Sequence, residues 1–312
     1  MTAWNVNDIP DQSGRTAVVT GANSGIGYVT ARELARRGAR VVLACRSEAR
    51  GSEAGDRIVT EVPGADVEFV RLDLGDLDSV GEFAATYDHA YGERLDLLVN
   101  NAGVMAPPPG RTTDGFETQF GVNHLGHFAL TGLLLPALLN TPRARVVTVS
   151  SMMHVLSGVD IDDLDSERPS YRRWIAYARS KTANLLFTHE LARRLAAVGS
   201  DVVAAAAHPG YASTNLQTTG PRMAGRKGAE RLMEIGNRVF GQSPRAGALP
   251  TLYAATAPGV RPDSFTGPSF AMWRGAPAES WRTGRTRDDT AGERLWDVSE
   301  QLTGVSYDAL KV

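Results

Sequence analysis

This chain of 312 residues has little cysteine, little net charge and no long apolar segment. Its one cysteine, Cys45, excludes a disulfide within the chain. No stretch reaches the roughly 18 continuous apolar residues of a membrane-spanning helix, and the first fourteen residues lack the apolar core of a signal peptide. The net charge of −2 gives no indication of a nucleic-acid partner. We therefore expect a cytoplasmic protein without a membrane span.

A glycine-rich turn follows the first apolar, β-branched run. Residues 15–20 lead into a turn over residues 21–27, and a helical pattern follows. Glycines allow a tight turn and a close approach to a pyrophosphate, whose charge is favoured at a helix N-terminus. Strand, glycine turn and helix in this order indicate a dinucleotide site. Its candidate residues are Gly21, Asn23, Ser24, Gly25, Ile26 and Gly27.

Strand and helix patterns alternate from residue 15 to about residue 207 without a linker-like break. Expected strands cover residues 15–20, 40–45, 67–72, 95–99, 144–149 and 201–207. Because helical patterns separate them, they predict a parallel sheet covered on both faces. We predict an α/β fold of the Rossmann type: a doubly wound parallel sheet in one domain over residues 1–312. Residues 15–207 would form the dinucleotide-binding core, 208–258 would cover the substrate, and 259–312 would form a C-terminal strand and extension.

Tyr177 and Lys181 stand four residues apart in the stretch YARSK. On a helix, two side chains at this spacing share one face and reach each other. A fixed ammonium beside a phenol favours the phenolate, so the pair predicts a tyrosine that exchanges a proton near neutral pH. The same spacing occurs on ordinary amphipathic helices, and the catalytic interpretation depends on the accompanying dinucleotide motif.

Six motifs, in order, resemble the single-domain branch of the short-chain dehydrogenase/reductase family. They are TGANSGIG at 20–27, NNAG at 100–103, FGVNHLGHF at 120–128, VVTVSS at 146–151, YARSK at 177–181, and HPG at 208–210 with Thr214. The larger sugar-nucleotide branch has glycine where Ser24 stands, which disfavours epimerase or dehydratase chemistry. LACR at 43–46 and ERLWDVS at 293–299 look closer to retinol-dehydrogenase-like and WW-oxidoreductase-like reductases. Several animal members of that subgroup carry a membrane anchor, which we do not expect in this chain.

The resemblance implies a catalytic set of Asn123, Ser151, Tyr177 and Lys181. Tyr177 would donate a proton to a carbonyl oxygen during reduction, while Lys181 would lower its pKa and bind the nicotinamide ribose. Ser151 would orient the substrate oxygen, with Ser150 the weaker candidate, and Asn123 would hold a water that links Lys181 to solvent. The alternatives are structural: Asn123 as a tie between two strands, and the serines as turn residues.

The end of the second expected strand bears on the choice of cofactor. An acidic residue there would bind the ribose 2′-OH of NAD, but this strand ends in Cys45 and Arg46. The planar guanidinium of Arg46 suits a 2′-phosphate, which favours NADP(H) over NAD(H); the alternative is a surface arginine. Asp73 and Leu74 match the family's adenine-contacting pair, although Asp73 could instead cap the helix that begins near Asp76. The family motifs add Asn100, Ala102, Gly103, Tyr177, Lys181, Pro209, Gly210 and Thr214 as cofactor-binding candidates.

The substrate-covering region is less clearly marked. Residues 105–113, 152–173 and 211–244 are able to cover the crevice at the strand C-termini. His154 is a candidate pocket residue because it follows Ser151 closely, and no histidine has a metal-ligand spacing, so no metal site is predicted. Residues 264–270 are expected to form the final edge strand, and the tryptophans at 273, 281 and 296 are expected mainly in the core. The basic residues Arg222, Arg226, Lys227 and Arg231 equally suit a solvated helix face.

These features predict an NADP(H)-dependent carbonyl reductase or alcohol dehydrogenase for a lipophilic ketone, aldehyde or secondary alcohol. The alternative is a nucleotide-sensing or scaffold protein with the same fold and little turnover, against which the complete catalytic set argues. The expected partner is a small-molecule substrate. Family members often associate through the helix that carries Tyr177, whereas a C-terminal extension is able to block that surface. Both a homo-oligomer and a monomer are therefore compatible with the sequence.

Overall fold

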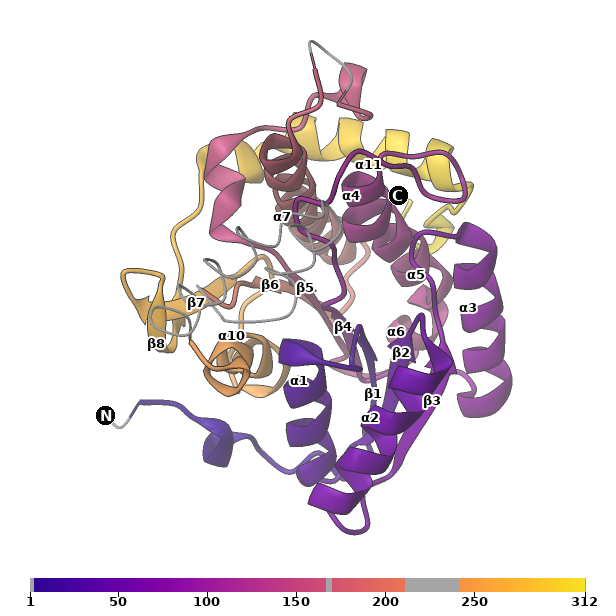
Figure 1. The fold of residues 1–312 in the computed structure, drawn as a ribbon, viewed down its shortest axis with the longest axis vertical. Helices are drawn as coiled ribbons and strands as arrows, with labels where there is room; N and C mark the ends of the chain where they lie inside the picture. The colour runs from indigo at the N-terminus through magenta and orange to yellow at the C-terminus, as the bar shows by residue number, and fades with distance from the viewer. Residues whose placement is uncertain (1–2, 167–169, 211–241, 312) are drawn as a thin grey trace.

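The computed structural model describes residues 3–166, 170–210 and 242–311. Within them, one eight-stranded sheet runs in the order β3-β2-β1-β4-β5-β6-β7-β8 (Figure 1). All neighbouring strands are parallel except β7 and β8. The strands are β1 (Thr16–Thr20), β2 (Arg40–Cys45), β3 (Val67–Arg71), β4 (Leu97–Asn100), β5 (Arg145–Val149), β6 (Val203–Ala207), β7 (Phe265–Phe270) and β8 (Arg274–Glu279).

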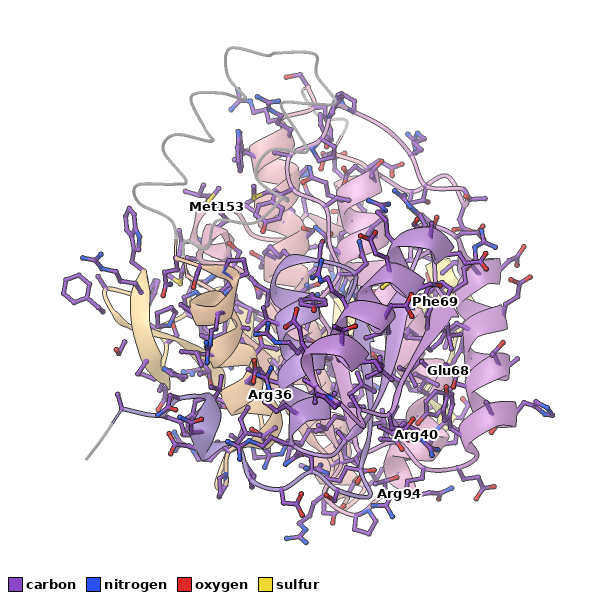
Figure 2. The ribbon with its side chains drawn as sticks, turned by 60° about the horizontal axis from the view of Figure 1, so that its bottom comes forward. Arg36, Arg40, Glu68, Phe69, Arg94 and Met153 are labelled. Atoms are coloured by element: carbon purple, nitrogen blue, oxygen red, sulfur yellow. The ribbon has the colours of Figure 1, made fainter. Side chains whose placement is uncertain are left out.

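The strand order reverses direction between β1 and β4, which is the switch point of a doubly wound sheet. This confirms the Rossmann-type α/β fold predicted from the sequence. Each of the six strands expected between residues 15 and 207 is present, with ends that differ by at most two residues. In Figure 2, Arg40 and Arg94 lie at the end of the sheet where the parallel strands begin, and Met153 lies toward the other end, where they finish.

Helices cover both faces of the sheet. On one face lie α1 (Gly25–Arg36), α2 (Glu48–Glu61) and α10 (Pro244–Thr256). On the other lie α3 (Leu77–Tyr91), α5 (Gly126–Leu133), α6 (Leu135–Leu139), α7 (Arg173–Ala197) and α11 (Asp289–Thr303). Shorter turns are η1 (Val6–Asp8), α4 (Thr118–Phe120), the π-helical η2 (Gly121–Leu125), η3 (Met152–Leu156), η4 (Ile161–Asp163), η5 (Gly284–Arg287) and η6 (Asp308–Leu310). Among the helices described, none is long and apolar enough to cross a membrane.

Strand β1 shows why the strands of this sheet are continuous apolar runs in the sequence. Side chains alternate between the faces of a strand. Val18 therefore joins the core beneath α3, α5 and α7, while Ala17 and Val19 join the core beneath α1 and α10. All three are fully buried. A strand buried on both faces has no polar alternation, and its carboxyl end is held rigidly where the glycine turn begins.

The prediction that residues 264–270 form the final edge strand is wrong in one respect. β7 is a strand, but β8 pairs with it antiparallel and occupies the edge. The connecting turn places Ala271 and Met272 at φ values of 49° and 58°. Turns of this kind usually use Asn-Gly, a signal that is missing here. Pro277 also weakens the strand pattern of β8, although proline is tolerated at a sheet edge.

The C-terminal extension returns to the core through one of its three tryptophans. Trp296 on α11 is 1% exposed and stacks on Phe187 of α7, with ring centroids 5.8 Å apart. Tyr307, 4.4 Å from the Trp296 ring, donates a hydrogen bond to the carbonyl oxygen of Phe128 on α5 at 2.6 Å. The core assignment therefore holds for Trp296, whereas Trp273 and Trp281 are exposed.

Candidate active site

The turn between β1 and α1 depends on glycine at two close contacts. Gly21 has a φ of +66°, and a Cβ there would lie 3.0 Å from Ala102. A Cβ on Gly27 would lie 2.4 Å from the amide nitrogen of Asn101 and 2.5 Å from the Gly21 carbonyl oxygen. Ser24 precedes α1 but its side chain makes no capping bond, and the first helical turn has no acidic residue. The N–H groups of this turn therefore suit an anion.

Thr20 joins the ends of β1 and β4 across the switch point. Its Oγ1 donates to the carbonyl oxygen of Val99 at 3.3 Å and accepts from the N–H groups of Asn101 at 2.9 Å and Ala102 at 2.8 Å. The Asn101 side chain donates back to the Thr20 carbonyl oxygen at 2.7 Å. Sequence reasoning gave neither Thr20 nor Asn101 a role, although both lie inside recognised motifs.

Asn123 lies in the π-helical η2 and is completely buried. Its Oδ1 accepts from Val104 N–H at 2.7 Å, and its Nδ2 donates to the Val104 carbonyl oxygen at 3.0 Å and to Ser180 Oγ at 2.9 Å. The side chain thus connects the loop after β4 to α7. The structural alternative from the sequence, in which Asn123 connects two strands, is therefore wrong in its partners. Its main-chain carbonyl oxygen lies 3.1 Å from His127 Nδ1, and the water-holding role of Asn123 stays a prediction.

Tyr177, Lys181 and Ser151 meet where β5 ends beside α7. Lys181 Nζ donates to the carbonyl oxygen of Val149 at 3.1 Å and lies 5.7 Å from the centre of the Tyr177 ring. Ser151 forms a hydrogen bond with the Tyr177 phenol. Ser150 instead donates to the Lys181 carbonyl oxygen at 2.7 Å, a structural role consistent with its lower rank as a candidate.

Burial controls the proton affinities of this set. It raises the pKa of Tyr177 to about 12, although the hydrogen bond with Ser151 acts in the opposite direction. It lowers the pKa of Lys181 to about 8. The sequence argument considered the charge of Lys181 but not the loss of water around the phenol, which disfavours the phenolate more strongly. In the protein alone, the pKa of Tyr177 is therefore not lowered as predicted.

Arg46 and Asp73 lie together at the ends of β2 and β3. The Arg46 side chain is 69% exposed, and its Nε is 3.9 Å from an Asp73 carboxylate oxygen. Asp73 also accepts from Gly75 N–H at 3.0 Å, whereas Asp76 caps α3 by accepting from Ser79 N–H. The alternative that Asp73 caps this helix is therefore wrong. Leu74 is buried in the core.

The remaining candidates lie at the ends of β4 and β6. Asn100 donates to Thr131 Oγ1 at 3.0 Å, while its buried Oδ1 has no partner among the described residues. A Cβ on Gly103 would lie 3.0 Å from Asn123 Oδ1 and 3.6 Å from Lys181 Nζ, which places this loop against the catalytic set. Ala102 lies in the same loop.

Pro209 and Gly210 lie just after β6, beyond His208. Gly210 has a φ of +65°, and a Cβ there would lie 2.2 Å from the Trp273 carbonyl oxygen. Gln242 donates to the Pro209 carbonyl oxygen at 3.3 Å. Thr214, most of the third covering segment and its four basic residues lie outside the described residues.

A model of the family described as short chain dehydrogenase matches residues 15–224. Mouse retinol dehydrogenase 12 is 41% identical over 295 residues, which cover 95% of this chain and 88% of that protein. The chain is a short-chain dehydrogenase. Human retinol dehydrogenase 14 is 40% identical over 305 residues, covering 94% of this chain and 87% of its own. The family and the retinol-dehydrogenase-like character predicted from the motifs are thereby confirmed.

Solved structures agree with this assignment. A crystal structure of a Mycobacterium paratuberculosis protein shares 44% identity at a TM-score of 0.80, covering 98% of this chain and 99% of its own. A crystal structure described as an NAD(P)-dependent gluconate 5-dehydrogenase from Beutenbergia cavernae, with NADP at low occupancy, shares 31% identity at a TM-score of 0.60. It covers 79% of this chain and 91% of its own. This short-chain dehydrogenase is an NAD(P)-dependent oxidoreductase that acts on alcohol and carbonyl groups.

The residues of this dehydrogenase fit a nicotinamide dinucleotide. The uncapped N-terminus of α1 and the close approach at Gly21 and Gly27 suit a pyrophosphate. Asn100 Oδ1 is a buried acceptor without a protein partner in the described parts of the chain. Arg46 presents an exposed guanidinium at the end of β2, the position that selects between ribose 2′-substituents.

An open groove of about 710 Å³ lies at the N-terminal end of α7. Its walls come from two of the three segments expected to cover the substrate, Pro108 and Pro109 from the first and residues 171–173 from the second. Trp174 continues the wall, and its ring meets the Tyr177 ring edge-on at 6.4 Å. His154 is not part of this lining. It is fully buried, with Nδ1 2.8 Å from the Ser151 carbonyl oxygen.

Proposed function

We propose that this enzyme is an NADP(H)-dependent carbonyl reductase or alcohol dehydrogenase for a lipophilic ketone, aldehyde or secondary alcohol. The observation that carries the proposal is the buried pair Tyr177 and Lys181, with the half-buried Ser151, beside a largely apolar groove. The similarity to retinol dehydrogenases supports a lipophilic substrate. NADP in the Beutenbergia structure supports a phosphorylated cofactor.

Each residue of the set has a defined task in carbonyl reduction. A reduced nicotinamide supplies the hydride. Because its pKa is about 12, Tyr177 keeps its proton at neutral pH and donates it from Oη to the carbonyl oxygen. Ser151 orients that oxygen by a hydrogen bond. The Lys181 ammonium, held by the Val149 carbonyl, stabilises the phenolate left behind.

Replacing Tyr177 by Phe tests the enzymatic role. We expect turnover of a ketone and aldehyde panel to fall by about 10²–10⁴-fold, because general acid catalysis contributes that much. Calorimetric binding of NADPH should stay within about twofold of the wild-type value, since ring and packing are kept. Tyr253→Phe is the matched control, because Tyr253 lies on α10, on the opposite face of the sheet.

Equal turnover by the Tyr177→Phe variant would contradict the assignment of the proton donor. A wild-type protein that binds NADPH without turnover, and whose cellular function survives Tyr177→Phe, would favour the nucleotide-sensing alternative.

Replacing Arg46 by Gln tests the cofactor preference. We expect the dissociation constant of NADPH to rise by about tenfold or more, because a guanidinium–phosphate contact is lost, while that of NADH changes little. Arg40→Gln is the control, since Arg40 lies at the opposite end of the same strand (Figure 2). A wild-type preference for NADH would show that the interpretation of Arg46 is wrong.

A further inference from the structure

Two arginines in the groove have no partner within the described protein. Arg172 is exposed and Arg173 is half-buried, and both line the groove next to Trp174. Neither side chain makes a hydrogen bond or ion pair with another described residue. Arg172 immediately precedes α7 but makes no capping bond with its side chain. Two positive charges therefore line a groove whose wall residue Trp174 contacts Tyr177, and no described residue neutralises them.

Two carboxylates in the described parts of the adjoining segments are already bound elsewhere. Glu117 accepts from the N–H groups of Gln119 and Phe120 and from the Tyr171 hydroxyl. Asp165 accepts from the Arg111 guanidinium at 3.0 Å and from Glu117 N–H at 3.1 Å. Because these hydrogen bonds hold both carboxylates, neither acts as a counter-ion for the arginines of the groove.

The rest of the groove suits an apolar body. Besides the two arginines, it is lined by Pro108, Pro109, Tyr171, Trp174 and Ile175. The hydroxyl of Tyr171 is directed to Glu117 and Gln119, so this residue presents its ring to the space. A mostly apolar wall with a few charged groups, in a volume of about 710 Å³, is typical of small-molecule sites.

We propose that the groove selects substrates that carry a carboxylate, which Arg172 and Arg173 bind while the apolar body lies against Pro108 and Trp174. This deepens the proposed function and rests on it. Tyr177 follows the two arginines by four and five residues, a rise of about 6–8 Å along the helix axis. We therefore choose test substrates in which an aromatic ring or a short chain separates the carboxylate from the reacting carbonyl. The reaction is unchanged: hydride passes from the reduced cofactor to the carbonyl carbon, and the proton passes from Tyr177 to its oxygen.

Matched acid and ester substrates test the proposal. The probes are para-acetylbenzoate and para-acetylcinnamate, each compared with its methyl ester, in the presence of NADPH. We expect a higher kcat/KM for the acids. The double variant Arg172→Gln, Arg173→Gln should raise KM for the acids by about tenfold or more, since hydrogen bonds to charged groups are lost, with kcat and the esters unchanged. Lysine at both positions should retain part of the preference, because the charge remains.

Arg143→Gln serves as the control, because this exposed arginine lies just before β5, at the end of the sheet where the parallel strands begin. Equal KM values for acid and ester, or an equal effect of the double variant on both, would overturn the carboxylate subsite while leaving the reductase function intact. If no carbonyl compound is turned over, the proposed function fails. Calorimetric binding of the same acids then decides the subsite, which is rejected if the double variant binds them as tightly as the wild type.

Discussion

Burial acts in opposite directions on the two groups at the centre of the site. It raises the pKa of the Tyr177 phenol and lowers that of the Lys181 ammonium, because each loses water around its charged form. At neutral pH both groups are therefore protonated, which is the combination that carbonyl reduction needs. In the oxidation direction Tyr177 must lose its proton, so the protein alone favours reduction near neutrality.

The pH dependence of cofactor binding should follow Lys181. With a pKa of about 8, its charge is present below that pH and is lost above it. We expect NADPH affinity and kcat/KM for reduction to decline as pH rises through about 8. Tyr177 does not titrate in this range because its pKa is about 12. Fluorescence titration with NADPH from about pH 6 to pH 10 measures the effect.

Lys181→Arg is the control for this prediction, because a guanidinium stays charged throughout the range. The NADPH affinity of this variant, plotted against pH, should show no inflection near pH 8. The same inflection in wild type and variant would assign the titration to another group.

For individual residues, the sequence predicted which ones form the site better than it predicted their contacts. Motif spacing located Tyr177, Lys181 and Ser151, and the structure brings them together. Motif spacing could not show that both polar atoms of the Asn123 side chain are occupied by Val104 and Ser180, because those contacts run from one helix to a loop and to another helix. Nor could spacing measure burial, which decides the direction of the Tyr177 pKa shift.

The C-terminal elements contribute unequally to stability, and their tryptophans provide the test. Trp296 is surrounded by Phe128, Phe187 and Tyr307. Trp296→Ala should lower the free energy of unfolding by about 3–5 kcal/mol, since a large cavity forms in the core. Trp281→Ala should change it by about 0.5 kcal/mol or less, because that side chain is 59% exposed. Urea unfolding followed by circular dichroism compares the two. A similar loss in both variants would contradict this account.

Among the elements, β8 shows where local patterns fail. Ala271 and Met272 both adopt a left-handed conformation that disfavours residues with a side chain, at a cost of about 1 kcal/mol or more each. Pairing with β7 over the strand and the packing beneath it must offset this strain. Such tertiary contacts do not appear in a window of local sequence, whereas the glycine turn after β1 is specified by its own residues.

For the molecule as a whole, α11 closes the outer side of the catalytic helix. Over residues 180–190 of α7, every residue is buried except the half-buried His189. His189 itself lies 2.9 Å from Asp263 and 2.8 Å from Asp289, at the start of α11. Residues 289–303 were expected only as part of a C-terminal strand and extension. Local sequence could not show the packing partners of Trp296, because Phe128 and Phe187 lie more than a hundred residues away along the chain.

We therefore expect the protein to be a monomer, because the surface through which family members often associate is occupied by its own chain. Light scattering coupled to size-exclusion chromatography should give the mass of one chain at all concentrations tested. Removing residues 289–312 should expose apolar surface and give a larger species. A full-length dimer would contradict this expectation.

The enclosure of α7 also has a genetic consequence. In the monomer that we expect, the helix that carries Tyr177 touches no neighbouring copy, so each molecule is active or inactive independently of the others. When wild-type protein is mixed with the Tyr177→Phe variant, activity should be proportional to the wild-type fraction, without poisoning by the inactive copies. A defective allele would then be recessive at the level of the enzyme, and rate would depend hyperbolically on substrate, without cooperativity.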